Sequence, residues 1–203
     1  MRGYPGDEQV LRAAGTRAAV TAMRSGRLVI APADYHYAVI TDAFSGPGLQ
    51  RLREARGVPE GSAVPVFIDR RTTLHALWGR VPRDAEILAR NFWPGPLTLI
   101  GRPQLSLAWS AGVGDAVAIR MPAHPWMLEL VAAVGPIAAT GAHVAGGPPA
   151  TRLADCDTTS VSIGLDGGEL PGGPASTVVD LRHGVDVVRA GAIPAEDIAA
   201  RLA

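Results

Sequence analysis

An aspartate and a histidine two residues apart stand directly after an apolar segment, in Pro32-Ala33-Asp34-Tyr35-His36-Tyr37-Ala38-Val39. If this stretch is extended, Asp34 and His36 share one face and Tyr35 and Tyr37 share the other. A carboxylate beside an imidazole can orient the ring for acid–base chemistry. A loop histidine with an ordinary structural hydrogen bond explains the same residues, and from these residues alone it is the favoured alternative.

Other polar residues follow predicted strands or end a predicted helix, which is where α/β proteins place ligand sites. The predicted catalytic residues are His36 and His143, and the predicted ligand-binding residues are Asp34, Tyr37, Arg56, Arg120, Thr140, Ser176 and Arg189. Arg56 complements the dipole of the helix that it ends, which is a sufficient structural explanation, or it clamps a carboxylate or phosphate. No metal ligand set is predicted.

Composition excludes several kinds of chemistry. All 19 basic residues are arginine, so a lysine Schiff base and a lysine-held phosphate are both impossible. The single cysteine, Cys156, forms neither an internal disulfide nor a cysteine-based zinc site. The formal net charge is zero, which argues against a protein that depends on clamping nucleic-acid phosphates, so RNA binding is expected to be weak.

Hydrophobic periodicity and the turn residues predict an α/β fold, a twisted mixed sheet flanked by helices, in a single domain over residues 1–203. The expected helices are 7–25, 48–56, 72–79, 82–90, 125–134 and one that begins at 194, and the expected strands are 28–31, 64–68, 97–100, 117–120, 137–140, 161–165, 177–181 and 185–189. No apolar run is long enough to span a membrane, and no signal peptide is evident, so the cytoplasm is the expected location.

Six segments in series make the chain resemble the YrdC/YciO family over about residues 26–193. The most specific are the turn Trp93-Pro94-Gly95-Pro96-Leu97-Thr98 and the strand Ser176-Thr177-Val178-Val179-Asp180. The resemblance implies a twisted mixed sheet around a positively lined cleft. It also implies the chemistry of the family's threonylcarbamoyl-adenylate synthases, which condense ATP, bicarbonate and L-threonine, release pyrophosphate and supply tRNA modification. ATP or AMP with Mg²⁺ are the expected cofactors.

The chain departs from the family pattern at the cleft. Glu54 stands at the position assigned to the family's lysine, and Gly141 and His143 stand where the family has serine and asparagine. A frayed end of the helix 48–56 would let Glu54 face the phosphates and repel them by a few kcal/mol before solvent screening. A regular helix would turn Glu54 to solvent instead, because residues two apart diverge by about 200°.

Three functions follow from this comparison. The leading hypothesis is an enzyme that binds an adenylate or a related phosphate- or carbamoyl-bearing small molecule, repurposed from threonylcarbamoyl-AMP synthesis. The second is a genuine L-threonylcarbamoyladenylate synthase in tRNA modification. The third is a non-catalytic module that binds double-stranded RNA or nucleotides, which the neutral charge disfavours.

Overall fold

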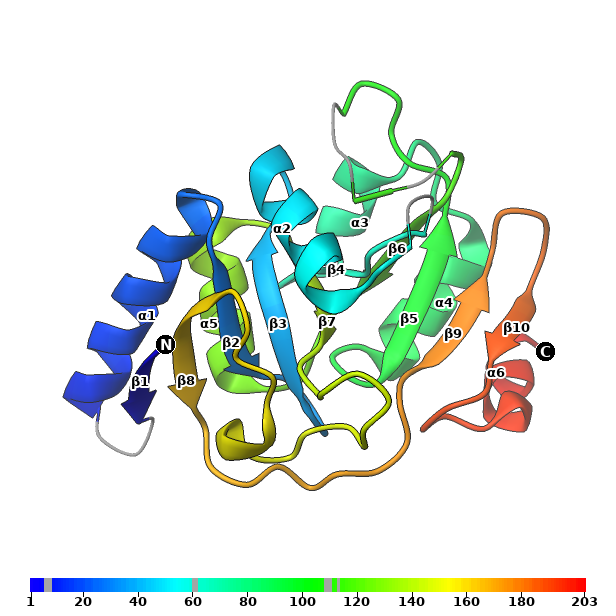
Figure 1. Ribbon diagram of the computed structural model, residues 1–203. Coiled ribbons are helices and arrows are strands. Elements are labelled where there is room, and N and C mark those ends of the chain that lie inside the picture. Colours follow the sequence, from blue (N-terminus) through cyan, green and yellow to red (C-terminus); the bar gives the residue numbers. More distant parts are fainter. Residues whose placement is uncertain (6–8, 60–61, 108–110, 113) are drawn as a thin grey trace.

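A ten-stranded mixed sheet forms the centre of the molecule (Figure 1). The computed structural model describes residues 1–5, 9–59, 62–107, 111–112 and 114–203. The strands are β1 (Arg2–Pro5), β2 (Leu28–Pro32), β3 (Tyr37–Asp42), β4 (Val66–Phe67), β5 (Leu97–Gly101), β6 (Val117–Arg120), β7 (Ile137–Gly141), β8 (Val161–Asp166), β9 (Thr177–Asp180) and β10 (Asp186–Arg189). The helices are α1 (Gln9–Arg24), α2 (Gly46–Arg56), α3 (Thr73–Leu77), α4 (Arg83–Phe92), α5 (Pro125–Val134) and α6 (Ala195–Leu202), with a 3₁₀ turn at Leu153–Asp155.

The order of the strands is β1-β8-β2-β3-β7-β4-β6-β5-β9-β10. The pairs β1–β8, β2–β8, β4–β6 and β5–β9 are parallel, and the other pairs are antiparallel. The predicted fold class, a mixed twisted sheet flanked by helices, is therefore confirmed. Apart from the pairs β2–β3 and β5–β6, its neighbouring central strands are not consecutive in the chain, so the sheet brings residues from different parts of the sequence to the same surface.

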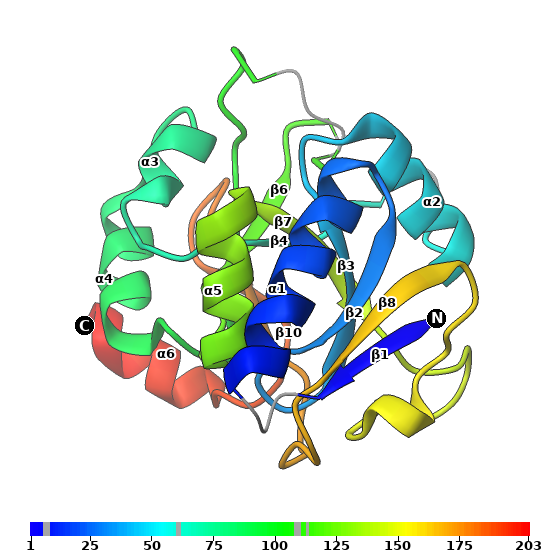
Figure 2. The same ribbon diagram turned by 90° about the vertical axis from the view of Figure 1, so that its left-hand side faces the viewer.

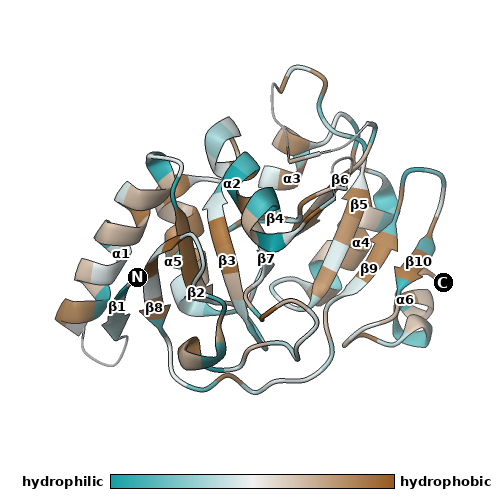
Figure 3. Ribbon diagram, in the orientation of Figure 1, coloured by the Kyte–Doolittle hydropathy of each residue, from teal (hydrophilic) through white to brown (hydrophobic). Residues whose placement is uncertain are grey.

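Both faces of the central strands are buried, which explains their continuous apolar sequences. In β2, Leu28 and Ile30 join one core cluster while Val29 and Ala31 join the other. The helices α1 and α5 lie side by side on the second cluster, as Figure 2 shows. The helix α2 packs on the first, and the apolar colouring of β2 and β3 in Figure 3 follows this double burial.

Helix α2 is capped at both ends, and this fixes the direction of its last turn. The Ser45 side chain accepts a hydrogen bond from the amide of Gly48 at 3.1 Å, an N-cap that satisfies one of the free amides of the first turn. Gly57 ends the helix in the left-handed conformation, with a φ of 57°, and its amide points back to the carbonyls of the last turn. The helix is therefore regular through Arg56, and of the two alternatives for its end the frayed one does not hold.

Two strands were not predicted. β1 was missed because a four-residue strand beside the N-terminus carries no alternating pattern, and β3 because the segment 32–39 was treated as one extended stretch. In the structure, β2 and β3 are antiparallel neighbours joined by a tight turn, in which Ala33 donates to the His36 carbonyl at 3.2 Å. The expected extended placement of Asp34 beside His36 is therefore wrong.

The other elements begin and end within two residues of the expected bounds in most cases. The strand expected at 64–68 is shorter, and the expected first residue of the first helix, Asp7, lies outside the described residues. None of the helices in the described part of the chain is both long and apolar enough to span a lipid bilayer.

The packing of Trp78 on β5 gives a stability prediction. A Cβ atom added at Gly101 would lie 2.4–2.5 Å from the indole ring of Trp78, which is buried. We expect Gly101→Ala to lower the free energy of unfolding by about 1–3 kcal/mol, because the ring has no room to move in a filled core. Denaturant unfolding measures the loss.

A matched control is Gly3→Ala in β1, where an added Cβ would contact nothing within 4 Å. The control variant should unfold at nearly the same denaturant concentration as the parent. Equal stabilities for both alanine variants would show that Trp78 does not hold this position.

Candidate functional site

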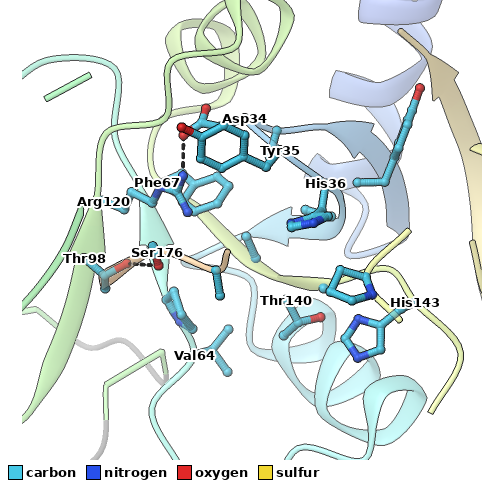
Figure 4. A pocket seen from close by; sticks show the side chains of 18 of the residues that line it. Asp34, Tyr35, His36, Val64, Phe67, Thr98, Arg120, Thr140, His143 and Ser176 are labelled. Carbon is cyan, nitrogen blue, oxygen red and sulfur yellow. Dashed lines mark hydrogen bonds and ion pairs between the residues drawn. The ribbon is translucent and has the colours of Figure 1, made fainter. Parts of the chain in front are cut away.

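A cavity of about 390 Å³ opens where the β2–β3 turn, the ends of β6 and β7 and the connection from β8 to β9 meet (Figure 4). This volume is typical of a small-molecule site. Of the predicted site residues, all except Arg56 line it, namely Asp34, His36, Tyr37, Arg120, Thr140, His143, Ser176 and Arg189. Their roles in binding and catalysis stay predictions, but the structure brings them together.

Asp34 and Arg120 form a buried ion pair at one end of the cavity. Their side chains are 6% and 12% exposed, and a nitrogen of the Arg120 guanidinium donates to the Asp34 carboxylate. The other Asp34 oxygen accepts from the backbone amides of Ala123 and His124, and Arg120 Nε donates to the Gly95 carbonyl at 3.0 Å. Asp34 therefore holds Arg120 in place, and the Asp34–His36 pair, the less favoured of the two alternatives for these residues, is not formed.

Arg189 forms the second cationic part of the wall. Its guanidinium donates to the Ser176 hydroxyl at 2.8 Å and to the Ser176 carbonyl at 2.9–3.0 Å. The Ser176 hydroxyl also shares a hydrogen bond of 2.9 Å with Thr98. Desolvation of the guanidinium, and then the nearby charge of Arg120, lower the pKa of Arg189. No acidic side chain in the described ranges pairs with Arg189, so its positive charge is free to attract an anion.

The two predicted catalytic histidines lie on the opposite part of the wall (Figure 4). His36 comes from the β2–β3 turn, and His143 follows the end of β7. Burial lowers the pKa of His36, and the neighbouring His143 and Arg120 lower it further, which favours the neutral form of its imidazole. A neutral imidazole can accept a proton from a ligand, which suits the predicted acid–base role.

Arg56 lies behind this wall and outside the cavity. Its side chain is 8% exposed, and its guanidinium donates to Asp157 at 2.9 Å and to the backbone carbonyl of His143. Arg56 therefore positions the loop that carries His143, and its predicted contact with the ligand does not fit this geometry. The wall residue that follows α2 is Val58 instead.

Glu54 points away from the cavity, as expected for a regular helix. It is exposed, and its carboxylate accepts a hydrogen bond of 2.8 Å from Gln50, one turn earlier on α2. The predicted repulsion between Glu54 and a bound triphosphate therefore has no geometric basis.

Tyr37 and Thr140 contribute in different ways. The Tyr37 hydroxyl donates to the Gly168 carbonyl at 2.8 Å and accepts from the Gly167 amide at 2.9 Å, so it fastens the segment after β8 and is not free for a ligand. Burial raises the pKa of this hydroxyl and keeps it neutral. The Thr140 hydroxyl is buried without a partner in the described structure, and Thr140 lines the cavity, so a ligand can complete its hydrogen bonding.

Sequence reasoning missed four residues of this site. Thr98 and Phe67 belong to strands that were predicted, but their apolar neighbours gave no reason to single them out. The Arg120 guanidinium lies 5.9 Å from the centre of the Phe67 ring, a cation–π contact. Val58 and Asp157 carried no sequence signal, because their roles depend on the contact between α2 and the loop after β7.

The described residues contain no group of three or more histidine, cysteine or acidic side chains that could hold a metal ion. Cys156 is buried, and burial raises the pKa of its thiol to about 12. It is therefore a neutral thiol, without the thiolate character of a nucleophile.

Comparison with known proteins identifies the family. A family model described as "Sua5_yciO_yrdC: Telomere recombination" matches residues 21–191. The chain belongs to the Sua5/YciO/YrdC family. The predicted resemblance is thereby confirmed, over nearly the range from which it was drawn.

Several members of the family are similar over most of this chain. A Mycobacterium tuberculosis protein named "Putative threonylcarbamoyl-AMP synthase" is 35% identical over 93% of this chain and 89% of its own length. The threonylcarbamoyl-AMP synthase of Bacillus subtilis is 34% identical over 96% of this chain, which spans 56% of that longer protein.

Solved structures agree in fold. The crystal structure of P. abyssi Sua5 in complex with L-threonine is 31% identical, with a TM-score of 0.87 over 99% of this chain and 60% of that one. The crystal structure of E. coli YciO has a TM-score of 0.81 over 97% of both chains, at 22% identity, and it supports the fold alone.

The buried ion pair gives a prediction about this end of the cavity. We expect Asp34→Ala to lower the free energy of unfolding by about 3–5 kcal/mol, because it leaves the Arg120 charge buried without its partner. Denaturant unfolding measures this. Glu169→Ala is the matched control, since the side chains of Glu169 and its partner Arg152 are 60% and 59% exposed and a surface pair contributes only about 0–1 kcal/mol. Similar losses in both variants would mean that Asp34 and Arg120 are solvated as a surface pair is.

Proposed function

We propose that this protein is an L-threonylcarbamoyl-AMP synthase. The observation that carries the proposal is the pair of guanidinium groups, Arg120 and Arg189, on the wall of one small-molecule cavity, the second without an acidic partner among the described residues. Such a wall attracts carboxylate and phosphate groups. Relatives named threonylcarbamoyl-AMP synthases are 34–35% identical over almost the whole chain, and the related Sua5 structure holds L-threonine.

The reaction needs two steps that this wall is suited to support. The amine of L-threonine and bicarbonate form a carbamate with loss of water, and a carbamate oxygen then attacks the α-phosphorus of ATP and displaces pyrophosphate. Both steps handle anions that repel one another. Fixed cations at the cavity offset that repulsion without reorganising during the reaction, which is the main electrostatic contribution an enzyme makes.

The geometry moves this function ahead of a repurposed ligand specificity. The strongest argument for repurposing was the charge of Glu54, and Glu54 is exposed on the far side of α2, away from the cavity. Gly141 and His143 remain differences from the family's serine and asparagine. They change the hydrogen-bonding groups on one wall and leave both arginines in place.

RNA binding does not gain support from the structure. Several arginines already pair with acidic side chains, among them Arg12, Arg56, Arg120, Arg152 and Arg182. With a net charge of zero, only a few phosphates can be neutralised, so we expect RNA binding that is weak and sensitive to salt. A cytoplasmic location, where ATP and tRNA meet, fits the proposed reaction.

The direct test is pyrophosphate release from ATP in the presence of bicarbonate and L-threonine, with the product identified by mass spectrometry. We expect release that depends on threonine, together with the mass of threonylcarbamoyl-AMP. ATP turnover that does not respond to threonine, or none at all beside an active relative, would contradict the proposal.

Two variants locate the activity in the cavity. We expect Arg189→Gln to lower kcat/KM by about 10–100-fold, the value of a charge-assisted hydrogen bond to a ligand. Glu54→Lys, a charge change of two units on the exposed side of α2 against one unit in Arg189→Gln, should change kcat/KM by less than about twofold. An increase of activity in the Glu54→Lys protein comparable with the loss in Arg189→Gln would place Glu54 at the ligand and contradict this assignment of the site.

A further inference from the structure

The residues Gly141 and His143 form one steric unit at the cavity wall. A Cβ atom at Gly141 would lie 2.7 Å from Nδ1 and 2.9 Å from Cε1 of the His143 imidazole. Real Cβ atoms do not approach other atoms so closely, so the imidazole occupies the space of a side chain at position 141. The two departures from the family pattern are therefore a single exchange, in which a ring from His143 replaces a side chain at 141.

His36 faces the same part of the cavity as this ring, as Figure 4 shows. The two residues come from different strand ends, and β3 and β7 are neighbours in the sheet with Ala38 opposite Gly141. The charge of His143 is close enough to lower the pKa of His36. The wall thus presents two imidazoles within electrostatic reach of one another.

Among the residues that the structure describes, the charged groups around the imidazoles leave no counter-ion for them. The cations are Arg120 from β6, Arg189 from β10 and Arg56 from α2. The nearby carboxylates are taken up: Asp34 pairs with Arg120, and Asp157 pairs with Arg56. Cys156, which bridges to His143 through the backbone, keeps its proton because its pKa is about 12. A protonated imidazole here gains a counter-charge only from a bound anion.

We propose that His36 and His143 form a proton-coupled anion site, which binds a phosphate or carboxylate group of the ligand in the imidazolium form. This anion site deepens the proposed function. It rests on that function because it takes the cavity to be the substrate site. Hydroxyl and amide groups bind an anion equally well at any pH near neutrality. Imidazoles instead make the affinity depend on proton uptake.

The sign of the effect follows from linkage. A bound anion favours the charged imidazole and raises the histidine pKa in the complex. The extra affinity is complete below the histidine pKa of the free protein. It is lost as the pH rises through the histidine pKa of the complex. Anion binding is therefore tighter at low pH and takes up protons from solution.

The experiment uses two probes, inorganic sulfate as a phosphate-like oxyanion and L-threonine as a carboxylate. Calorimetric titrations at about pH 5.5 and about pH 7.5, in buffers of different ionisation enthalpy, give the affinity and the protons taken up. Histidine NMR gives each imidazole pKa with and without the probe. We expect affinity about tenfold higher at the lower pH and a raised pKa for both rings, with at least one probe. The probe that shows the effect identifies the anionic group.

Variants assign the effect to these two rings. His36→Gln and His143→Gln should each weaken the pH dependence, and the double variant should abolish it. His75→Gln is the matched control, because His75 is 57% exposed on α3, outside the cavity. Affinity that is independent of pH in the parent, or a pH dependence that persists in the double variant, overturns the proposal.

A double-mutant cycle tests the steric unit itself. We expect Gly141→Ser to weaken binding of the probe that shows the pH effect about tenfold while His143 is present, because the serine displaces the ring, and to have almost no cost in a His143→Asn background. Thermal unfolding shows that each variant is folded. Additive effects would mean that the ring does not occupy the space of residue 141.

These outcomes are separate from those of the synthase assay. Proton-linked binding of sulfate without pyrophosphate release would sustain the anion site and contradict the proposed function. Pyrophosphate release with anion binding that does not depend on pH would sustain the proposed function and contradict the proton-coupled anion site.

Discussion

The ion pair between Asp34 and Arg120 is the constraint on which the site depends. It ties the turn between β2 and β3 to the end of β6, across strands that are not neighbours in the sheet. The carboxylate also accepts from two backbone amides just before α5, so one side chain fixes a turn, a cation and a helix entrance. Burial makes this arrangement rigid, because breaking it would leave an uncompensated charge. The position of the Arg120 guanidinium in the cavity wall is therefore fixed.

A similar arrangement lies behind the wall that carries His36 and His143. The Arg56 guanidinium donates to the Asp157 carboxylate and to the His143 carbonyl. It therefore holds the loop after β7 and does not reach the cavity. The three arginines therefore have different roles. Arg56 and Arg120 are anchored by carboxylates, while in the described part of the chain Arg189 is held by Ser176 alone and keeps its charge for a ligand. A neutral protein thereby presents a locally positive cavity.

Much of the fold could be predicted from the sequence, because buried strands and capped helices leave local patterns. The helix 125–134 and the strand 117–120 were predicted at their observed bounds. Most of the predicted site residues line one cavity, since they lie at or beside the ends of strands, but their roles could not be predicted. Asp34, His36 and Arg56 show why: a two-residue spacing does not tell a turn from a strand, and a helix end does not tell which way its arginine points. Those directions are set by a cap at Gly57 and by partners more than 80 residues away.

The central claim is that one cavity, between Arg120, Arg189 and the two histidines, binds the substrates of the reaction. A crystal structure of the full chain with L-threonine and a non-hydrolysable ATP analogue tests it most directly. We expect ligand density in this cavity, with a carboxylate or phosphate oxygen within hydrogen-bond distance of the Arg189 guanidinium. Ligands bound on another surface, or beside Glu54 on the exposed side of α2, would contradict it.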